Sequence, residues 1–191
     1  TASFDVNWLT MGPRVAEFEE KMAVRLGVKH AVAMTNGTVA LDVAFKILGI
    51  APGDEVICPA MTYIATASAI SYQQAVPVFV DIERDSHNLD PARVEEAISP
   101  KTKAIVYIDY AGNPADLETL QALADEHNLI LFQDAAQSLV GVYHDRELGA
   151  QTEISSMSFH MAKVMSSVEG GMIFTHNDAF AQEARIRRNQ G

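Results

Sequence analysis

The sequence has few of the residues that cross-link a protein or give it positive charge. Its single cysteine, Cys58, excludes a disulfide framework and a thiolate metal site, and we predict no bound metal. The 14 lysine and arginine residues are outnumbered by 25 aspartate and glutamate residues, which gives a net charge of -11. Because no basic stripe offsets this charge, we expect neither nucleic acid nor a membrane as a partner. The basic cluster of Arg185, Arg187 and Arg188 is interpreted as a solvated helix face.

Long hydrophobic runs are also absent. No segment has the length of a membrane span, and no signal-peptide pattern appears, so we expect the protein to be cytoplasmic. Hydrophobic residues make up 48% of the chain and charged residues 20%, which is ordinary usage for a folded protein and does not indicate disorder. The length of 191 residues suits one well-buried domain.

Short apolar runs alternate with segments of helical periodicity along the chain. Strands are expected at 30–34, 55–58, 76–82, 103–108, 129–134, 154–159 and 172–175, and helices at 13–26, 38–48, 60–73, 90–98, 115–127 and 178–189. Such alternation is typical of a parallel sheet with helices on both faces. The sequence therefore predicts an α/β fold, a three-layer α/β/α sandwich with a mostly parallel sheet. Residues 1–12 are expected to form an irregular lead-in.

An aspartate and a lysine stand out against this pattern. Asp134 ends an apolar strand, which places its carboxylate at the edge where open α/β sheets bind ligands. Lys163 is the one lysine on the polar loop between the last two predicted strands. Pyridoxal phosphate (PLP) requires two such groups, a lysine for the Schiff base and an aspartate that keeps the ring nitrogen protonated. A helix-capping aspartate and a solvated lysine are the alternatives.

The turn between the first strand and its helix is a candidate phosphate site. Gly37 lets the backbone approach a ligand, Thr38 offers a hydroxyl, and the helix N-terminus offers N–H groups and a favourable dipole. An ordinary capped helix is an equally good interpretation of this turn by itself. After the next strand, Tyr63 either stacks on a flat ring or lies in the core with its hydroxyl paired.

Four motifs occur together in one order along the chain. They are Asn36-Gly37-Thr38, Asp134-Ala135-Ala136-Gln137, Ser158-Phe159-His160-Met161-Ala162-Lys163 and Glu169-Gly170-Gly171. This set resembles the DegT/StrS family of PLP-dependent nucleotide-sugar aminotransferases, which have the fold type I of aspartate aminotransferase. The resemblance covers essentially the whole chain. It implies that residues 1–191 are the PLP-binding large domain, that a C-terminal small domain is missing and that the chain is a fragment.

The resemblance also implies roles around the cofactor ring. Lys163 corresponds to the Schiff-base lysine, which later moves the proton between cofactor and substrate carbon. Asp134 corresponds to the partner of the ring nitrogen, and Gln137 to the residue that hydrogen-bonds the ring hydroxyl oxygen. Tyr63 occupies the position of the aromatic residue that stacks on the ring.

Further residues are implied at the phosphate and around the lysine loop. Gly37, Thr38 and Ser158 correspond to the residues that bind the phosphate. His160 lies where the family often has histidine or an aromatic residue, and packing explains this position at least as well as chemistry. Glu169 is expected to order the loop before the glycine pair.

The reaction implied by the resemblance moves an amino group from glutamate onto a keto sugar carried on a nucleotide diphosphate. The implied enzyme is a homodimer with shared active sites. One alternative is a PLP-dependent sugar dehydratase of the same family, in which histidine replaces the lysine, so Lys163 argues against it. The others are a catalytically silent PLP-fold protein that binds or regulates, and a phosphate-binding α/β domain without PLP.

Overall fold

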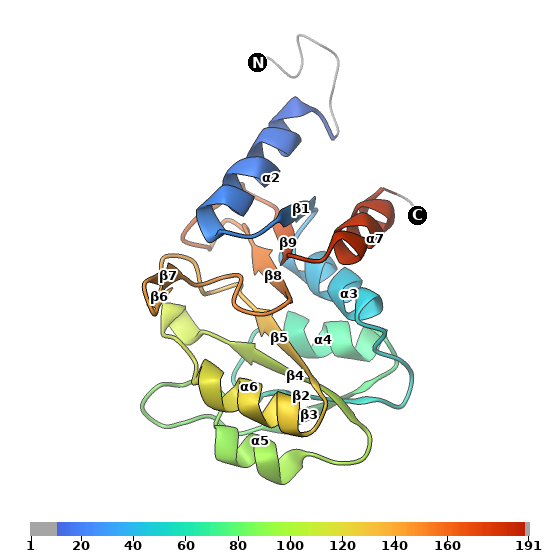
Figure 1. The fold of residues 1–191 in the computed structure, drawn as a ribbon, viewed down its shortest axis with the longest axis vertical. Helices are drawn as coiled ribbons and strands as arrows, with labels where there is room; N and C mark the ends of the chain where they lie inside the picture. Colours follow the sequence, from blue (N-terminus) through green and yellow to red (C-terminus); the bar gives the residue numbers. More distant parts are fainter. Residues whose placement is uncertain (1–10, 190–191) are drawn as a thin grey trace.

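The computed structural model describes residues 11–189, so most of the predicted lead-in at 1–12 lies outside the described residues. Figure 1 shows a central sheet with helices on both of its faces. The elements in chain order are α2 (Pro13–Leu26), β1 (His30–Met34), α3 (Gly37–Ile47), β2 (Glu55–Pro59), α4 (Ile64–Tyr72), β3 (Val76–Val80), α5 (Pro91–Ala97), β4 (Thr102–Ile108), the short 3-10 helix η1 (Tyr110–Gly112), α6 (Leu117–Glu126), β5 (Ile130–Asp134), β6 (Val142–Tyr143), β7 (Arg146–Glu147), β8 (Ile154–Ser158), β9 (Gly171–Thr175) and α7 (Asp178–Arg188). The predicted three-layer α/β/α fold is confirmed.

Of the seven strands that the structure describes in the main sheet, six run in the same direction. The strand order is β1-β9-β8-β5-β4-β2-β3, and β9 is antiparallel to both of its neighbours, β1 and β8. Consequently the carboxyl ends of the six parallel strands meet the beginning of β9 at one edge. Ile108 pairs with Asp134 near this edge, and Ser158 pairs with Gly171. The sheet topology therefore gathers several candidate residues where α/β sheets bind ligands.

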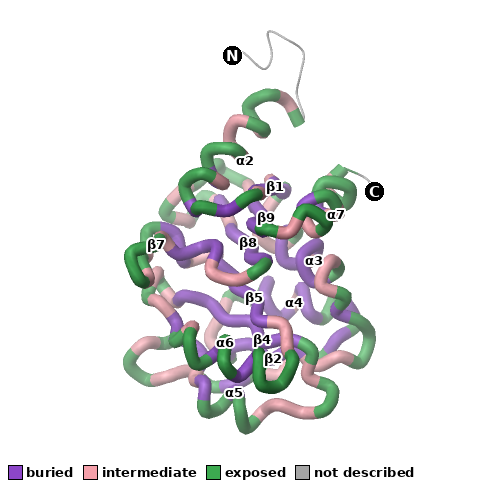
Figure 2. Tube along the Cα trace, viewed as in Figure 1, coloured by how far each residue is buried: buried purple, intermediate pink, exposed green. Residues whose placement is uncertain are grey.

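Two hydrophobic layers hold the helices on the sheet. α3, α4 and α7 pack on one face through side chains such as Phe45, Ile70 and Ala181. On the other face, α2 packs beside β8 and β9 through Leu26, and α5 and α6 pack beside β4, the latter through Leu120. Figure 2 shows that most of the buried residues lie on the strands and on the inner sides of the helices. The core thus fixes the sheet whose edge carries the candidate site.

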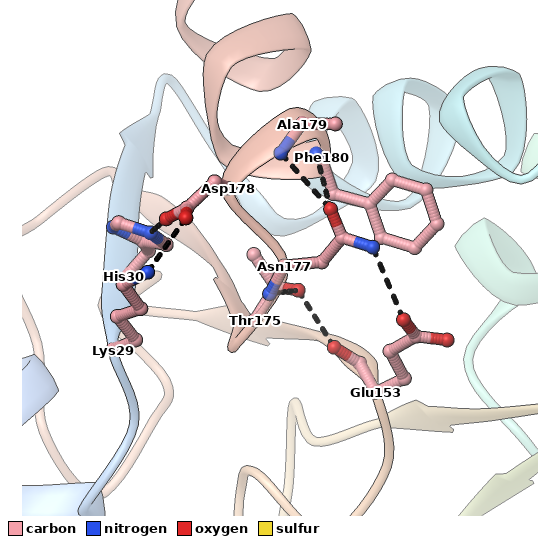
Figure 3. A network of polar contacts seen from close by, with 8 residues as sticks. All are labelled: Lys29, His30, Glu153, Thr175, Asn177, Asp178, Ala179 and Phe180. Atoms are coloured by element: carbon pink, nitrogen blue, oxygen red, sulfur yellow. Dashed lines mark hydrogen bonds and ion pairs between the residues drawn. The ribbon is translucent and has the colours of Figure 1, made fainter.

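The helices begin and end where the chain supplies a suitable capping residue. Gly27 adopts a left-handed φ of 66° and ends α2. The side chain of Asn36 begins α3 by accepting a backbone N–H of its first turn. Asn177 begins α7 in the same way, by accepting the N–H groups of Ala179 and Phe180 (Figure 3). None of the helices within residues 11–189 has both the length and the apolar character needed to span a membrane.

Three local predictions differ from the structure. β3 ends at Val80 because the chain leaves the sheet there, and Ile82 forms only an isolated bridge with Leu89. α4 begins at Ile64 rather than at residue 60, since residues 60–63 form an irregular connection after β2. The hairpin of β6 and β7 was not predicted, because strands of two residues are too short to show a hydrophobic period.

The interpretation of the basic cluster as a solvated helix face is wrong for Arg188. Its side chain is only 14% exposed, and it donates to the Glu19 carboxylate and, at 3.3 Å, to the carbonyl oxygen of Ala33. Glu19 in turn accepts the N–H of Ala33 at 2.8 Å. Because β1 is an edge strand, this ion pair satisfies backbone groups that would otherwise be open to pairing with another chain.

Candidate active site

A cavity of about 460 Å³ opens at the sheet edge where β5 ends. Its volume lies in the range of small-molecule and cofactor sites. It is lined by all seven residues predicted to hold the cofactor, namely Gly37, Thr38, Tyr63, Asp134, Gln137, Ser158 and Lys163. His160 and Glu169 line the same cavity. The structure therefore brings the candidate residues together, while their individual roles stay predictions.

The N-terminus of α3 forms one end of the cavity. The first N–H groups of a helix have no acceptor within it, and Asn36 accepts that of Val39 at 2.9 Å. Gly37 and Thr38 are the first two residues of the helix, and both line the cavity. An anion placed here meets backbone N–H groups, a threonine hydroxyl and the positive end of the helix dipole.

Two glycines let β8 and β9 approach this helix end closely. A Cβ atom on Gly37 would lie 2.8 Å from the Cβ of Ser158, and one on Gly171 would lie 2.2 Å from the carbonyl oxygen of Asn36. Neither distance is sterically tolerable, so the tight arrangement depends on glycine at both positions. It brings the Ser158 hydroxyl next to the helix N-terminus, as the predicted phosphate site requires.

Asp134 provides a buried carboxylate at the end of β5. It is 4% exposed, and its two oxygens accept the Thr66 hydroxyl at 2.7 Å and the Ala136 N–H at 3.1 Å. Burial raises the pKa of Asp134 above its ordinary value, while these two donors and the positive charge of Lys163 act in the opposite direction. The helix-cap alternative is wrong, because a turn and not a helix follows Asp134, whose carboxylate accepts the N–H of Ala136 in that turn and faces the cavity.

A second buried carboxylate, Asp109, supports the segment that follows Asp134. Asp109 accepts hydrogen bonds from Gln133 Nε2 at 2.7 Å, Ser138 Oγ at 2.6 Å and the N–H of Ala115 at 3.1 Å. Burial raises the pKa of Asp109, and these three donors oppose the shift. Because Gln133 and Ser138 lie on either side of residues 134–137, Asp109 fixes both ends of that segment.

Gln137 is oriented by its own hydrogen bond. Its side-chain oxygen accepts the N–H of Ala111 at 3.0 Å. With the oxygen occupied, the amide NH₂ group is the end that remains for a ligand in the cavity. This orientation matches the predicted hydrogen bond from Gln137 to a ring hydroxyl oxygen.

Lys163 lies on the loop of residues 159–170 between β8 and β9. The ends of this loop are joined by backbone hydrogen bonds, from Phe159 N to Gly170 O at 2.8 Å and from Met161 N to Val168 O at 2.9 Å. Lys163 is half-buried and lines the cavity, which departs from the alternative of a solvated loop lysine.

His160 and Tyr63 lie at the rim of the cavity. His160 Nε2 is 3.6 Å from Glu169 Oε1, which is an ion pair when the imidazole is protonated, and His160 Nδ1 accepts the N–H of Ala162. Tyr63 is 68% exposed and directly precedes α4, so the alternative of a core tyrosine is wrong. Its stacking on a ring stays a prediction.

Sequence reasoning missed Thr62, Thr66 and Asp109. Thr66 is fully buried on α4, and Thr62 links to it through hydroxyl oxygens 2.9 Å apart. Two threonines four residues apart at the start of an apolar helix were the available signal. Nothing in that spacing indicates that Thr66 reaches Asp134, which lies 68 residues further along the chain.

The fold and the cavity define a class of protein, the PLP-dependent transferases of fold type I. The chain belongs to the DegT/DnrJ/EryC1/StrS aminotransferase family, whose model matches residues 1–191.

Three named proteins illustrate the similarity. GDP-perosamine synthase from Caulobacter vibrioides is 40% identical over 188 residues, which are 98% of this chain and 51% of that protein. The crystal structure of DesI with its TDP-sugar product has a TM-score of 0.91 and 38% identity, over 97% of this chain and 47% of DesI. Spr1654 from Streptococcus pneumoniae, a candidate sugar aminotransferase solved in a PLP form, has a TM-score of 0.92 and 29% identity, over 97% of this chain and 53% of Spr1654. The chain thus spans about half the length of the relatives it matches.

PLP is the cofactor of this family, and the cavity fits it. Its phosphate is a dianion, which suits the helix N-terminus and the hydroxyls of Thr38 and Ser158. Its ring nitrogen carries a proton when paired with a carboxylate, and Asp134 is a buried carboxylate that faces the cavity. The distinct chemistry at the two ends of the cavity matches the two polar ends of the cofactor.

Proposed function

We propose that the full-length protein is a PLP-dependent aminotransferase that moves an amino group from glutamate onto a keto sugar carried on a nucleotide diphosphate. The observation that carries this proposal is the gathering of Asp134, Lys163 and the N-terminus of α3 around one cavity. The relatives support the substrate class, since one is named a GDP-perosamine synthase and another was solved with a TDP-sugar product. Residues 1–191 form the PLP-binding large domain in this proposal.

Each polar group of the site has a task in this reaction. When bound, PLP supplies an electron sink that stabilises negative charge on the substrate carbon next to nitrogen. Lys163 would hold the cofactor through Nζ, and its amine would move a proton to and from the substrate. Asp134 holds the proton on the ring nitrogen. Gly37, Thr38 and Ser158 bind the phosphate, Gln137 orients the ring, and Tyr63 covers one ring face.

We also propose that the protein acts as a homodimer with shared active sites. Tyr63 and Ile64 are each 68% exposed, and Met161 and Val164 on the lysine loop are 68% and 76% exposed. Large apolar side chains gathered near a cavity mouth are typical of a surface covered by another subunit. A second subunit would also contribute donors to the dianionic phosphate. Light scattering of the full-length protein with and without PLP tests this assembly, and an active monomer would overturn it. The cytoplasmic location stays a prediction.

The activity is tested by locating the cofactor and following the amino group. Full-length protein is incubated with PLP, reduced with borohydride, digested and examined by mass spectrometry. We expect the added mass on Lys163 and none on the exposed Lys103, whose replacement by alanine serves as the control variant. In parallel, glutamate and a nucleotide-linked keto sugar should yield 2-oxoglutarate and an amino sugar.

The same experiment separates the alternatives. A deoxygenated sugar without nitrogen would favour the dehydratase. Modified Lys163 without turnover of any keto sugar would favour a silent binding protein. No mass added to Lys163 would overturn the assignment of PLP to this cavity.

A further inference from the structure

A chain of hydroxyl groups lies behind Asp134. Thr66 is fully buried on α4, and its Oγ1 is 2.7 Å from Asp134 Oδ2. Thr66 is not among the described residues that line the cavity, so it acts on a ligand only through Asp134. One turn earlier, Thr62 lines the cavity, and its Oγ1 is 2.9 Å from Thr66 Oγ1. The three side chains therefore form a continuous line from the helix to the carboxylate and back to the cavity wall.

The direction of these hydrogen bonds follows from counting protons. An ionised carboxylate only accepts, and each threonine hydroxyl has a single proton to donate. With Asp134 ionised, the proton of Thr66 is used on the carboxylate, so Thr62 is the donor to Thr66. If Asp134 takes up a proton, the hydroxyls can rotate and the chain can run in the opposite direction. The arrangement thus responds to the charge of Asp134 without any movement of the backbone.

We propose that Thr66, supported by Thr62, is a positioning residue that keeps Asp134 ionised and holds its carboxylate in one orientation toward the cavity. This inference deepens the proposed function, on which its meaning for the cofactor rests. Its physical basis is independent of the cofactor, because the donor to the buried carboxylate comes from the chain itself.

The charges around Asp134 show why such a donor matters. Burial raises its pKa, and the negative charge of Asp109 acts in the same direction. Opposing them are the Thr66 hydroxyl, the N–H of Ala136 and the positive charge of Lys163, of which Thr66 has the largest effect. Lys163 changes its contacts when it binds a cofactor, whereas Thr66 is fixed in a packed helix. Thr66 is therefore the donor that remains in place throughout.

The first test uses full-length protein without cofactor, and three variants. Thr66→Val keeps the shape of the side chain and removes the hydroxyl, and Thr66→Ser restores the donor. Thr175→Val is the control, because Thr175 is equally buried but its hydroxyl donates to the backbone carbonyl of Glu153 at 2.7 Å, at the far end of β9 (Figure 3). Stability is measured as the urea midpoint across a range of pH.

The expected pH dependence has a definite sign. A carboxyl group with a raised folded pKa binds more protons in the folded than in the unfolded state, so stability falls as pH rises between the two pKa values. Without the Thr66 hydroxyl the folded pKa is higher still. Thr66→Val should therefore lose more stability near neutral pH than in acid, Thr66→Ser should resemble the parent, and Thr175→Val should lose the same amount at every pH. A pH-independent loss in Thr66→Val would overturn the proposal.

The second test measures PLP affinity by fluorescence titration. Thr66→Val should lower the affinity for PLP by on the order of tenfold, which corresponds to the net free energy of one hydrogen bond to a charged group. The same change made in an Asp134→Asn background should add little, because no charge remains to be stabilised. An equal loss of PLP affinity in both backgrounds would show that Thr66 acts through packing and not through the charge of Asp134. If the pH-dependent loss is found while none of the proteins binds PLP, the proposed function fails and the role of Thr66 toward Asp134 stands.

Discussion

Asp134 and Lys163 line the same cavity but have very different surroundings. Asp134 and its support Asp109 are 4% and 1% exposed, and each has donors from at least two elements of the fold. The lysine loop is open by contrast, since Met161, Val164 and Val168 are 68%, 76% and 69% exposed. It is held by strand pairing at its ends and by backbone hydrogen bonds across it.

Because of this difference, substitutions on the two sides of the site should have different effects on stability and on function. The carboxylate side is organised by the folded chain before any ligand arrives, so removing its supporting contacts should affect both stability and function. The lysine side depends on few contacts within the described residues, so changes there should affect function with little effect on folding.

Lys163→Ala should abolish transamination and covalent binding of PLP, because no other amine lies on the loop. Its melting temperature without PLP should equal that of the parent, since the loop contributes little to the core. Activity assays and calorimetry on the full-length protein measure both quantities, with Lys103→Ala as the matched control. Conversion of a keto sugar by Lys163→Ala would contradict the assignment.

Asp134→Asn should lower the rate by orders of magnitude, because a neutral amide does not hold the proton on the ring nitrogen. Folding should change little, since the asparagine oxygen accepts the N–H of Ala136, its amide group donates to the Thr66 hydroxyl, and the cost of a buried charge is relieved. Steady-state kinetics and urea unfolding report the two effects. A decrease of only a few-fold would indicate that Asp134 is a structural carboxylate.

Gly171→Ala should destabilise the protein by up to about 3 kcal/mol, because the new Cβ overlaps the backbone of Asn36, which cannot move aside. PLP affinity should fall as well, since the overlap would displace β9 from the N-terminus of α3, where the predicted phosphate site lies. Gly37→Ala meets the side chain of Ser158 instead, so adding Ser158→Gly should restore part of the lost stability. Unfolding and PLP titration measure these effects, and an undisturbed Gly171→Ala variant would contradict the tight approach.

Asp109→Asn should lower the free energy of unfolding by about 1–2 kcal/mol at acid pH, because the two amide hydrogens of asparagine face three donors, whereas a protonated carboxyl has only one hydrogen to place among them. Burial raises the pKa of Asp109, so the parent loses stability as pH rises between the ordinary and the raised value, and the variant does not. The difference between the two proteins should therefore shrink as pH increases. Urea unfolding at several pH values measures this trend, and a widening difference would show that Asp109 is stabilised as the anion.

Within a single subunit, Val164→Ser should change the free energy of unfolding by no more than about 0.5 kcal/mol, because its side chain is 76% exposed there, whereas the loss should be larger where the proposed homodimer covers this loop. A larger loss that depends on protein concentration would show that a second subunit covers the loop.

The sequence supported the prediction of those features that depend on neighbours in the chain. Asp134 at a strand end and Lys163 on a loop between strands could be located because a strand of alternating α/β units has a defined carboxyl end. Contacts between distant residues could not be predicted, such as Thr66 with Asp134 or Asp109 with Ser138. These pairs depend on the order of strands in the sheet, and hydrophobic periodicity contains no information about that order.

The reversed direction of β9 has a consequence for how the lysine position can vary. A parallel connection must cross the sheet and needs a dozen or more residues, usually with a helix. Because β9 is antiparallel to β8, the loop of residues 159–170 leaves and re-enters the sheet at the same edge. Residues can therefore be added to or removed from the tip of this loop with every strand left in register. The length of the loop that carries Lys163 is therefore independent of the strand positions on which the buried carboxylate depends.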